Sequence, residues 1–205
     1  MSVCQDDAVA DGDHGDGGGL PPAQRPAHGW PVVHYGPLPR LRPEIWDLRV
    51  FGATESGSET RFDAGAFAEL PTTTLRGDLH CVTKWTVSDL EWTGVTAADL
   101  MRAAPPADDA THVMVHAEYG YSVNLPLDVF AAPDTLFATH VRGAPLTPEH
   151  GYPLRLVCPS RYAWKSAKWV REVEYLVGDR RGFWEERGYH NRADPWQGER
   201  YSYQE

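Results

Sequence analysis

Short apolar runs, each ended by Gly or Pro, limit what this chain can fold into. Residues 46–50 (WDLRV) alternate apolar and charged side chains and are followed by Gly52, which is the two-residue period of a half-buried strand and its turn. A run that begins at Asp63 stops before Pro71, so it leaves room for only a short helix. We therefore expect many short elements.

The remaining pattern predicts a fold dominated by sheet. Thr96 and Asp99 form a capping-box-like start for a second short helix, which Pro105 ends. Residues 72–85 are rich in Thr and Val and predict a strand that runs into a loop carrying Cys81. Further strands are predicted at residues 112–117 and 121–125, which flank Gly120 as a hairpin, and at 136–141, 154–158 and 169–177. Short helices between strands indicate the α+β class, mainly β.

The length of 205 residues, 41% of them hydrophobic, is enough to bury one sizeable core. We expect one domain over residues 28–205, preceded by a disordered acidic tail over residues 1–27, where large apolar side chains are scarce. The aromatic-rich residues 182–205 are expected to fold back and cover apolar surface, because free tails rarely carry so many Trp and Tyr.

Charge and hydropathy exclude several partners. The 19 basic and 29 acidic residues give a net charge of −10, which opposes attraction to nucleic acid or to an anionic membrane surface. The N-terminus has no twin arginine and no apolar signal core, and no stretch approaches the roughly 20 apolar residues that a membrane helix needs. We expect a cytoplasmic protein without a membrane span.

The chain contains three cysteines: Cys4, Cys81 and Cys158. They are too few and too far apart for a disulfide framework, and no CxxC pair indicates zinc, so any cysteine chemistry is that of a single thiolate. Arg76, His80 and Lys84 lie close in sequence to Cys81, and a nearby positive charge or metal keeps a thiol ionised. A buried, inert cysteine is the other interpretation, and spacing alone leaves both open.

A second candidate site follows the apolar strand at residues 154–158. Lys165, Ser166 and Lys168 lie close together at a predicted turn, where ammonium, hydroxyl and backbone N–H donors can bind a phosphate. A solvated basic loop would show the same residues. Arg155 is harder to explain in that way, because an arginine within an apolar strand needs an anionic or hydrogen-bonding partner.

Three motifs in this order, HCVTKW (80–85), HGYPLR (150–155) and WKSAKWV (164–170), resemble the molybdopterin-dependent oxidoreductases of the sulfite-oxidase superfamily. The similarity covers residues 30–196 and is greatest to small standalone bacterial members related to the catalytic subunit of the periplasmic methionine-sulfoxide reductase system. It implies the sulfite-oxidase-type molybdopterin-binding fold and a molybdenum-molybdopterin cofactor. It also implies a small-molecule substrate and an unidentified electron donor or acceptor.

The resemblance assigns roles to single residues. Cys81 matches the cysteine whose thiolate binds molybdenum, and a soft ligand of this kind suits the metal. The positions matched to cofactor binding are His34, His116, His150, Arg155, Lys165, Ser166, Ala167 and Lys168. Trp85, Tyr119 and Tyr121 are expected to line the approach of the substrate.

The sequence also departs from the family. Sulfite oxidases usually follow their cysteine with an Asn-Arg-rich segment, whereas this chain continues with VTKW (82–85), which disfavours sulfite as the substrate. Sulfite oxidases and the related nitrate reductases carry an additional β-sandwich dimerisation domain, for which 205 residues leave no room.

Two other functions fit parts of the pattern. The same fold and pterin pocket would serve a redox-inactive binding module. Cys81 could instead be the nucleophile of a hydrolase with His80 or His116 as its base, but adjacent strand residues point to opposite faces, which places His80 poorly. We therefore expect a molybdenum-dependent oxidoreductase that transfers an oxygen atom to or from a small substrate, with Cys81 as the metal ligand.

Overall fold

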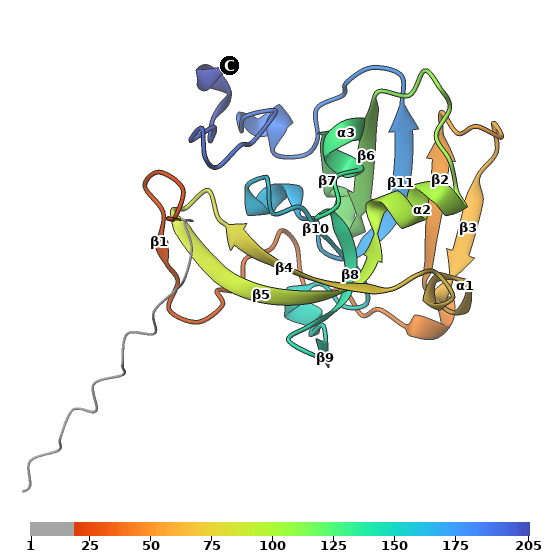
Figure 1. Cartoon of the computed structure of the whole chain (residues 1–205), viewed down its shortest axis with the longest axis horizontal. Coiled ribbons are helices and arrows are strands. Elements are labelled where there is room, and N and C mark those ends of the chain that lie inside the picture. Colours follow the sequence, from red (N-terminus) through yellow and green to blue (C-terminus); the bar gives the residue numbers. More distant parts are fainter. Residues whose placement is uncertain (1–18) are drawn as a thin grey trace, which may run out of the picture.

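Two β-sheets build the protein, which confirms the expected α+β, mainly β class (Figure 1). The computed structural model describes residues 19–205. The five-stranded sheet has the order β3 (Thr60–Asp63), β2 (Asp47–Gly52), β11 (Val170–Leu176), β6 (His112–Ala117) and β7 (Ser122–Pro126). The six-stranded sheet has the order β1 (Arg25–Pro26), β5 (Trp85–Thr96), β8 (Leu136–Val141) and β10 (Arg155–Val157), with β4 (Thr73–His80) on β5 and β9 (Ala144–Pro145) on β8.

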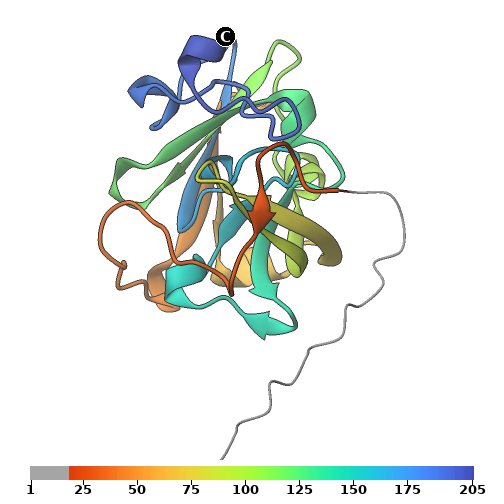
Figure 2. The same cartoon turned by 90° about the vertical axis from the view of Figure 1, so that its left-hand side faces the viewer.

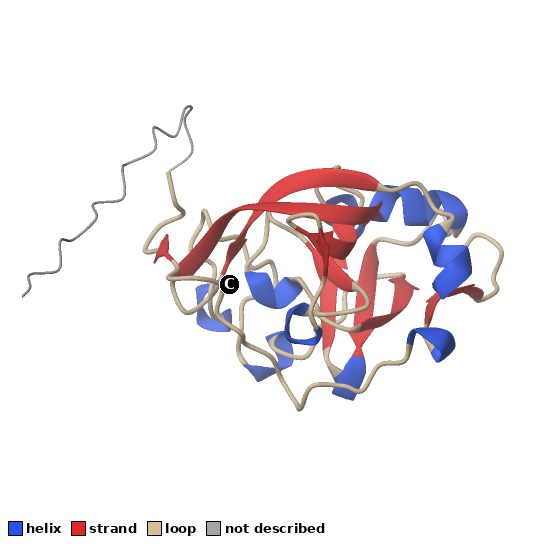
Figure 3. Cartoon of the chain, turned by 90° about the horizontal axis from the view of Figure 1, so that it is seen from below, coloured by secondary structure: helices blue, strands red, loops and turns tan. Residues whose placement is uncertain are grey.

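The helices are short, and all but the last two 3-10 turns lie between strands along the described chain (Figure 3). The α-helices are α1 (Ala64–Ala68), α2 (Ala97–Ala103) and α3 (Leu127–Phe130), and the 3-10 turns are η1 (Pro43–Ile45), η2 (Glu118–Gly120), η3 (Pro148–His150), η4 (Ala163–Lys165), η5 (Glu185–Arg187) and η6 (Ser202–Gln204). The two predicted caps are confirmed: Asp63 accepts from the Ala66 N–H at 2.8 Å, and Thr96 accepts from the Asp99 N–H at 3.0 Å. Over residues 19–205, no helix has the length and apolar character needed to cross a membrane.

The main core lies where the two sheets face each other. Alternation along each strand decides which residues enter it: in β2, Leu48 and Val50 are fully buried, whereas Arg49 between them is not. In β8, Phe137 belongs to this core, while its neighbours Leu136 and Ala138 pack on the other face of the sheet. A smaller third cluster contains Cys81, Val82, Tyr162, Trp164 and Ala193. The sheets therefore leave Cys81 outside the main core.

The long strand β5 was not predicted, because irregularities interrupt its alternation. Asp89 has a φ of 55°, and the register with β4 shifts between Gly77 and Leu79. At Gly94, an added Cβ would lie 2.1 Å from the Phe137 carbonyl oxygen, so only glycine lets β5 and β8 approach here. The preceding strand β4 ends at the loop that carries Cys81, as the sequence predicted, and β5 begins after that loop.

The N-terminal boundary falls earlier than expected. Of the predicted tail, residues 1–18 lie outside the described residues. Arg25 and Pro26 form β1 and pair in parallel with Trp85 and Thr86 of β5, so ordered pairing begins before residue 28. Figure 2 shows the segment after β1 as a long loop that continues to η1.

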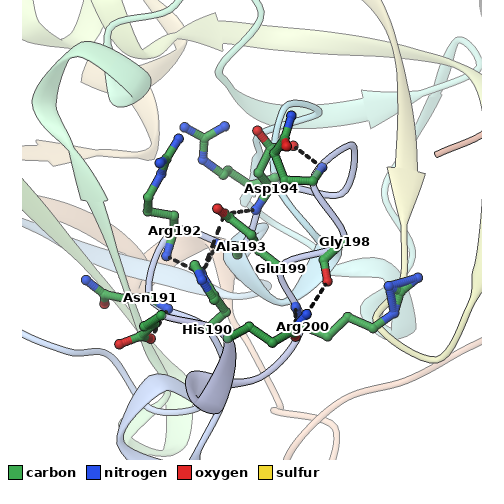
Figure 4. Close-up of polar contacts among 12 residues, drawn as sticks. His190, Asn191, Arg192, Ala193, Asp194, Gly198, Glu199 and Arg200 are labelled. Carbon is green, nitrogen blue, oxygen red and sulfur yellow. Dashed lines mark hydrogen bonds and ion pairs between the residues drawn. The ribbon is translucent and has the colours of Figure 1, made fainter. Parts of the chain in front are cut away.

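The C-terminal residues fold back on the domain, as expected. Figure 4 shows their internal hydrogen bonds: His190 Nδ1 accepts from the Arg192 N–H at 3.1 Å, and Glu199 Oε2 accepts from the Asp194 N–H at 3.0 Å. Arg200 donates to the Tyr162 hydroxyl and, at 3.2 Å, to the Pro22 carbonyl. The C-terminal segment is thereby joined both to the third cluster and to the N-terminal segment.

Candidate functional site

A cavity of about 190 Å³ lies between the β4–β5 turn, residues 30–35, the loop around η4 and the C-terminal segment. Five of the residues expected at the site line it: His34, Cys81, Arg155, Ser166 and Lys168. Trp85 and Tyr121, which were expected to line the substrate approach, also belong to its walls. The three motifs thus meet at one cavity, although the first lies more than 60 residues before the other two in sequence.

A tight turn holds Cys81 at the cavity. The Lys84 N–H donates to the Cys81 carbonyl at 3.0 Å, and the Cys81 N–H donates to the Trp85 carbonyl at 2.8 Å. Lys84 accommodates the turn with a φ of 71°. The Gln24 side chain adds a bond to the Cys81 carbonyl at 3.0 Å. Because both backbone groups of Cys81 are bonded, its backbone is held in place beside the cavity.

Apolar and aromatic residues surround this cysteine. We call Cys81, Val82, Thr83, Trp164, Trp184 and Tyr189 the sulfur wall. The ring of Tyr189 stacks on Trp184 at 5.0 Å between centroids and meets Trp164 edge-on at 4.9 Å. Sequence reasoning did not assign Trp184 or Tyr189 to the site. The available signal was the aromatic-rich C-terminus, which we interpreted only as a cover for apolar surface.

Positively charged and polar groups form what we call the cationic wall. It consists of Arg155, Ser166 and Lys168 of the lining, with His150 beside them. Lys168 faces Arg155 across a β-bridge next to β10. The turn before β10 approaches Arg155 and Lys168 closely at Gly151, which has a φ of 110°. A Cβ added to Gly151 would lie 2.9 Å from the Arg155 Cβ and 3.3 Å from the Lys168 Cβ. A side chain at residue 151 would therefore push the two cations apart.

The guanidinium of Arg155 is buried and bonded to backbone carbonyls alone. It is 2% exposed and donates to His150 at 3.2 Å, Ser166 at 3.2 Å and, more weakly, its neighbour Leu156 at 3.4 Å. Carbonyl oxygens carry no net charge, so these bonds leave the positive charge uncompensated. Within residues 19–205, Arg155 forms no ion pair.

The ammonium of Lys168 also bonds only to backbone carbonyls of the described residues. Its ammonium donates to the carbonyls of Val33, at 2.9 Å, and Glu149, at 2.6 Å, and it forms no ion pair with any described residue. Burial, followed by the charge of Arg155, lowers the pKa of Lys168 to about 7. Burial also lowers the pKa of Arg155 to about 10. The charge of an anion placed here would oppose both shifts, so the wall favours a negatively charged ligand.

His150 adds a polar atom that lacks a partner. Its ring stacks on Trp30 at 3.7 Å, and its Nδ1 is buried without a hydrogen bond from any described residue. Burial, then the charges of Lys168 and Arg155, lower the pKa of His150 to about 4, which keeps the ring neutral near pH 7. A buried unpaired nitrogen is costly by itself, so it indicates that a ligand group completes the site.

Besides His150, three expected cofactor contacts do not line this cavity. The Lys165 ammonium is fully buried and bonds to the Asn124 carbonyl at 2.8 Å and to Glu185 Oε1 at 2.6 Å, so its charge is already compensated. Ala167 is 1% exposed in the main core, where its carbonyl accepts from the Leu156 N–H at 2.8 Å. The two lysines lie in different local structures, because Lys165 ends the 3-10 turn η4 and Lys168 lies in a β-bridge with Arg155.

His116 lies elsewhere, because β6 alternates. Val115 and Ala117 face the main core, so His116 points to the other face of the five-stranded sheet. Its Nε2 meets Glu174 at 2.8 Å, and it lines a separate polar cavity of about 400 Å³. Tyr119, 44% exposed, lines that second cavity and not the first.

Neither histidine expected as the base of a hydrolase, His80 or His116, lines the cavity of Cys81. His116 lines the other cavity, and His80, whose pKa is lowered by burial, bonds through Nδ1 to Thr86 at 2.9 Å and is absent from the lining around Cys81. No group of three His, Cys, Asp or Glu residues gathers anywhere in residues 19–205. A metal bound by Cys81 would thus take its other ligands from a cofactor. A cation pair, an unpaired imidazole nitrogen and one soft sulfur fit an anionic cofactor that carries a soft metal.

Comparison with known proteins also indicates a cofactor that carries a soft metal. A family model described as "Oxidoreductase molybdopterin binding domain" matches residues 35–184. The chain is 43% identical over 188 residues to the uncharacterized oxidoreductase YuiH of Bacillus subtilis (strain 168), covering 91% of this chain and 93% of that protein. It is 29% identical over 154 residues to the protein-methionine-sulfoxide reductase catalytic subunit MsrP of Xanthomonas campestris pv. campestris, covering 66% of this chain and 46% of that protein.

A solved structure shares the fold. The sulfane dehydrogenase SoxCD from Paracoccus pantotrophus superimposes with a TM-score of 0.62 at 21% identity, over 69% of this chain and 40% of that chain. The chain thus spans nearly the whole Bacillus protein but under half of the Xanthomonas and Paracoccus proteins. The family match over residues 35–184 and the 43% identity show that this chain belongs to the molybdopterin-binding oxidoreductases of the sulfite-oxidase superfamily, whose cofactor is molybdenum-molybdopterin.

Proposed function

We propose that this oxidoreductase transfers an oxygen atom to or from a small substrate, and that the Cys81 thiolate is the protein's ligand to molybdenum. One observation carries the proposal: the cysteine side chain shares a cavity with two cations, Arg155 and Lys168, that no described carboxylate neutralises. The cofactor, when bound, supplies two-electron oxygen-transfer chemistry, and the protein supplies position and electrostatic field.

The cationic wall is the part that we expect to hold the cofactor's phosphate. The Lys168 ammonium has three N–H donors and uses two on the Val33 and Glu149 carbonyls, so one donor is left for a phosphate oxygen. The Ser166 hydroxyl accepts from the Cys158 N–H at 3.0 Å and still has its own proton to donate. Arg155 adds a charge that burial makes strong, because little water screens it.

The sulfur wall is the part that we expect to meet the substrate. Its aromatic rings exclude water from the sulfur of Cys81, and no Arg or Lys side chain belongs to it. The Tyr189 hydroxyl forms no hydrogen bond with the described residues, and burial raises the pKa of Tyr189, so the neutral hydroxyl can donate to a substrate oxygen. This lining favours a small organic substrate over an oxyanion such as sulfite.

The relatives differ in what their names say they act on, so they support the reaction class more than one substrate. The names include a methionine-sulfoxide reductase, a nitrate reductase and a sulfane dehydrogenase. The existence of an electron donor or acceptor and the cytoplasmic location stay predictions.

Replacement of the cysteine tests the proposal. Cys81→Ser, made in a host that synthesises molybdopterin, should keep the cofactor through the cationic wall but lose turnover by more than about 100-fold. Changing a residue that only supports a metal ligand already costs about 10–100-fold. Turnover is followed by the oxidation of a reduced viologen dye with a panel of S-oxides and N-oxides. Cys158→Ala is the matched control, because Cys158 is buried away from the cavity and should leave turnover unchanged. Full activity of Cys81→Ser with molybdenum bound would refute the ligand assignment.

A redox-inactive pterin-binding module on the same fold is the second candidate. Paramagnetic resonance of the wild-type protein separates the two functions. A molybdenum signal that appears on adding reductant supports the enzyme, whereas silence at full molybdenum occupancy supports the module.

A further inference from the structure

The hydroxyl of Thr83 lies against the sulfur of Cys81. Its Oγ1 is 3.1 Å from the Cys81 Sγ, and both residues line the cavity. Within residues 19–205, Thr83 Oγ1 has no other hydrogen-bond partner, and no second group bonds to this sulfur. The contact is therefore a single, well-defined interaction at the atom that we propose to bind molybdenum.

The turn between β4 and β5 fixes this contact. Its two backbone bonds, from the Lys84 N–H to the Cys81 carbonyl at 3.0 Å and from the Cys81 N–H to the Trp85 carbonyl at 2.8 Å, close the loop around residues 82 and 83. Thr83 is itself exposed, so core packing does not force its side chain toward the sulfur. A β-branched side chain has few χ1 rotamers, which further limits its movement.

The metal decides which atom donates. A free thiol could donate to the hydroxyl or accept from it, but a thiolate bound to a metal has no proton and can only accept. Thr83 must then donate its O–H to the sulfur of Cys81. Hydrogen bonds to an ionised acceptor are stronger than neutral ones, so metal binding strengthens this contact.

A hydrogen bond to a ligand sulfur changes the metal's redox behaviour. It draws electron density from the sulfur, makes it a poorer donor to the metal, and so favours the reduced state. The rest of the sulfur wall is apolar or aromatic around Cys81, and no other donor among the described residues bonds to this sulfur.

We propose that Thr83 is a positioning residue that raises the reduction potential of the bound molybdenum through its hydrogen bond to the Cys81 sulfur. The inference rests on the proposed ligation by Cys81. It goes beyond that proposal because it assigns to this chain's own turn the setting of the potential at which the site accepts electrons.

Thr83→Val tests the proposal, because valine keeps the branched shape and removes the hydroxyl. In a redox titration followed by paramagnetic resonance, the one-electron reduction constant should fall about tenfold, which corresponds to a potential lower by about 59 mV. The charge-transfer band from the Cys81 sulfur to molybdenum should move to lower energy, since this sulfur becomes a better donor. Molybdenum content should stay at the wild-type level.

Two further variants isolate the hydroxyl. Thr83→Ser keeps the donor and should restore both potential and band, whereas Thr83→Ala should behave as Thr83→Val does. The matched control is Thr74→Val on the same hairpin, where the hydroxyl bonds to Thr93 at 2.8 Å and does not line the cavity. This control should leave the potential and the band unchanged.

Each outcome separates this proposal from the one on which it rests. An unchanged potential and band in Thr83→Val and Thr83→Ala overturns the role of Thr83, and so does a Thr83→Ser variant that matches Thr83→Val. If Cys81→Ser keeps the charge-transfer band, the ligation itself is wrong. Loss of the band in Cys81→Ser together with no effect at Thr83 leaves the ligation intact and removes only the tuning role.

Discussion

The cationic wall and the sulfur wall of the cavity are stabilised in different ways. Arg155 and Lys168 lie at the paired edge of a sheet, where their hydrogen bonds go to carbonyl oxygens and no described carboxylate pairs with them. The Arg155 guanidinium also lies over the Trp92 ring, 5.1 Å from its centroid. Cys81 lies in a tight turn, and aromatic rings that the C-terminal segment supplies surround it. The cationic wall lacks a counter-charge, whereas the sulfur wall lacks only a partner for the Tyr189 hydroxyl, because the Cys81 sulfur contacts the Thr83 hydroxyl. Cofactor retention and redox chemistry should therefore respond to different substitutions.

The largest effect on stability is expected at Lys165. The sequence analysis assigned this lysine to cofactor binding, but in the structure it pairs with Glu185 away from the cavity. Lys165→Met leaves the buried carboxylate of Glu185 without its partner, and breaking a buried pair in this way costs about 3–5 kcal/mol. Urea unfolding of the cofactor-free protein measures the loss. A change below about 1 kcal/mol would show that this ion pair is not buried as described.

Lys168→Met should leave the fold largely intact and weaken cofactor retention. Losing a charged hydrogen bond to phosphate costs about 1.5–3 kcal/mol, or roughly 10–100-fold in affinity. Molybdenum content after extended dialysis measures retention. Lys84→Met is the control, because this lysine neighbours Cys81 in sequence but does not line the cavity. Equal loss in both variants would remove the distinction between the cationic wall and general positive charge.

The dependence of stability on pH sharpens the same contrast. The pKa of Lys168 falls from 10.5 to about 7 on folding, so between these values the unfolded chain binds more protons than the folded one. The cofactor-free protein should therefore gain stability from this group as the pH rises from about 7 toward 10.5. The unfolding free energies at pH 7.5 and 9.5 should differ more in the wild type than in Lys168→Met. An identical pH dependence in the two proteins would show that the Lys168 ammonium is not desolvated.

The smallest effect is expected at His116. Its contact with Glu174 is partly exposed, and pairs of this kind contribute about 1 kcal/mol at most. His116→Gln should leave molybdenum content and turnover at wild-type levels. Cofactor loss in this variant would mean that the second cavity, and not only the first, contacts the cofactor.

Local patterns account for what the sequence predicted well. The alternation in β2, the caps at Asp63 and Thr96 and the hairpin around Gly120 depend on neighbouring residues, and each is confirmed. The strand β5 was missed because bulges at Asp89 and Gly94 interrupt its period, and the need for glycine at residue 94 comes from β8, a different part of the chain.

The sequence by itself determined the family, the cofactor and the three motifs that meet at the cavity, because motif order and local spacing are properties of the chain alone. Only the tertiary structure decided which side chains face that cavity. Lys165 and Lys168 are three residues apart, yet one is neutralised by Glu185 and the other keeps an uncompensated charge. Burial and the position of a partner from a distant segment set that difference, and sequence spacing contains neither.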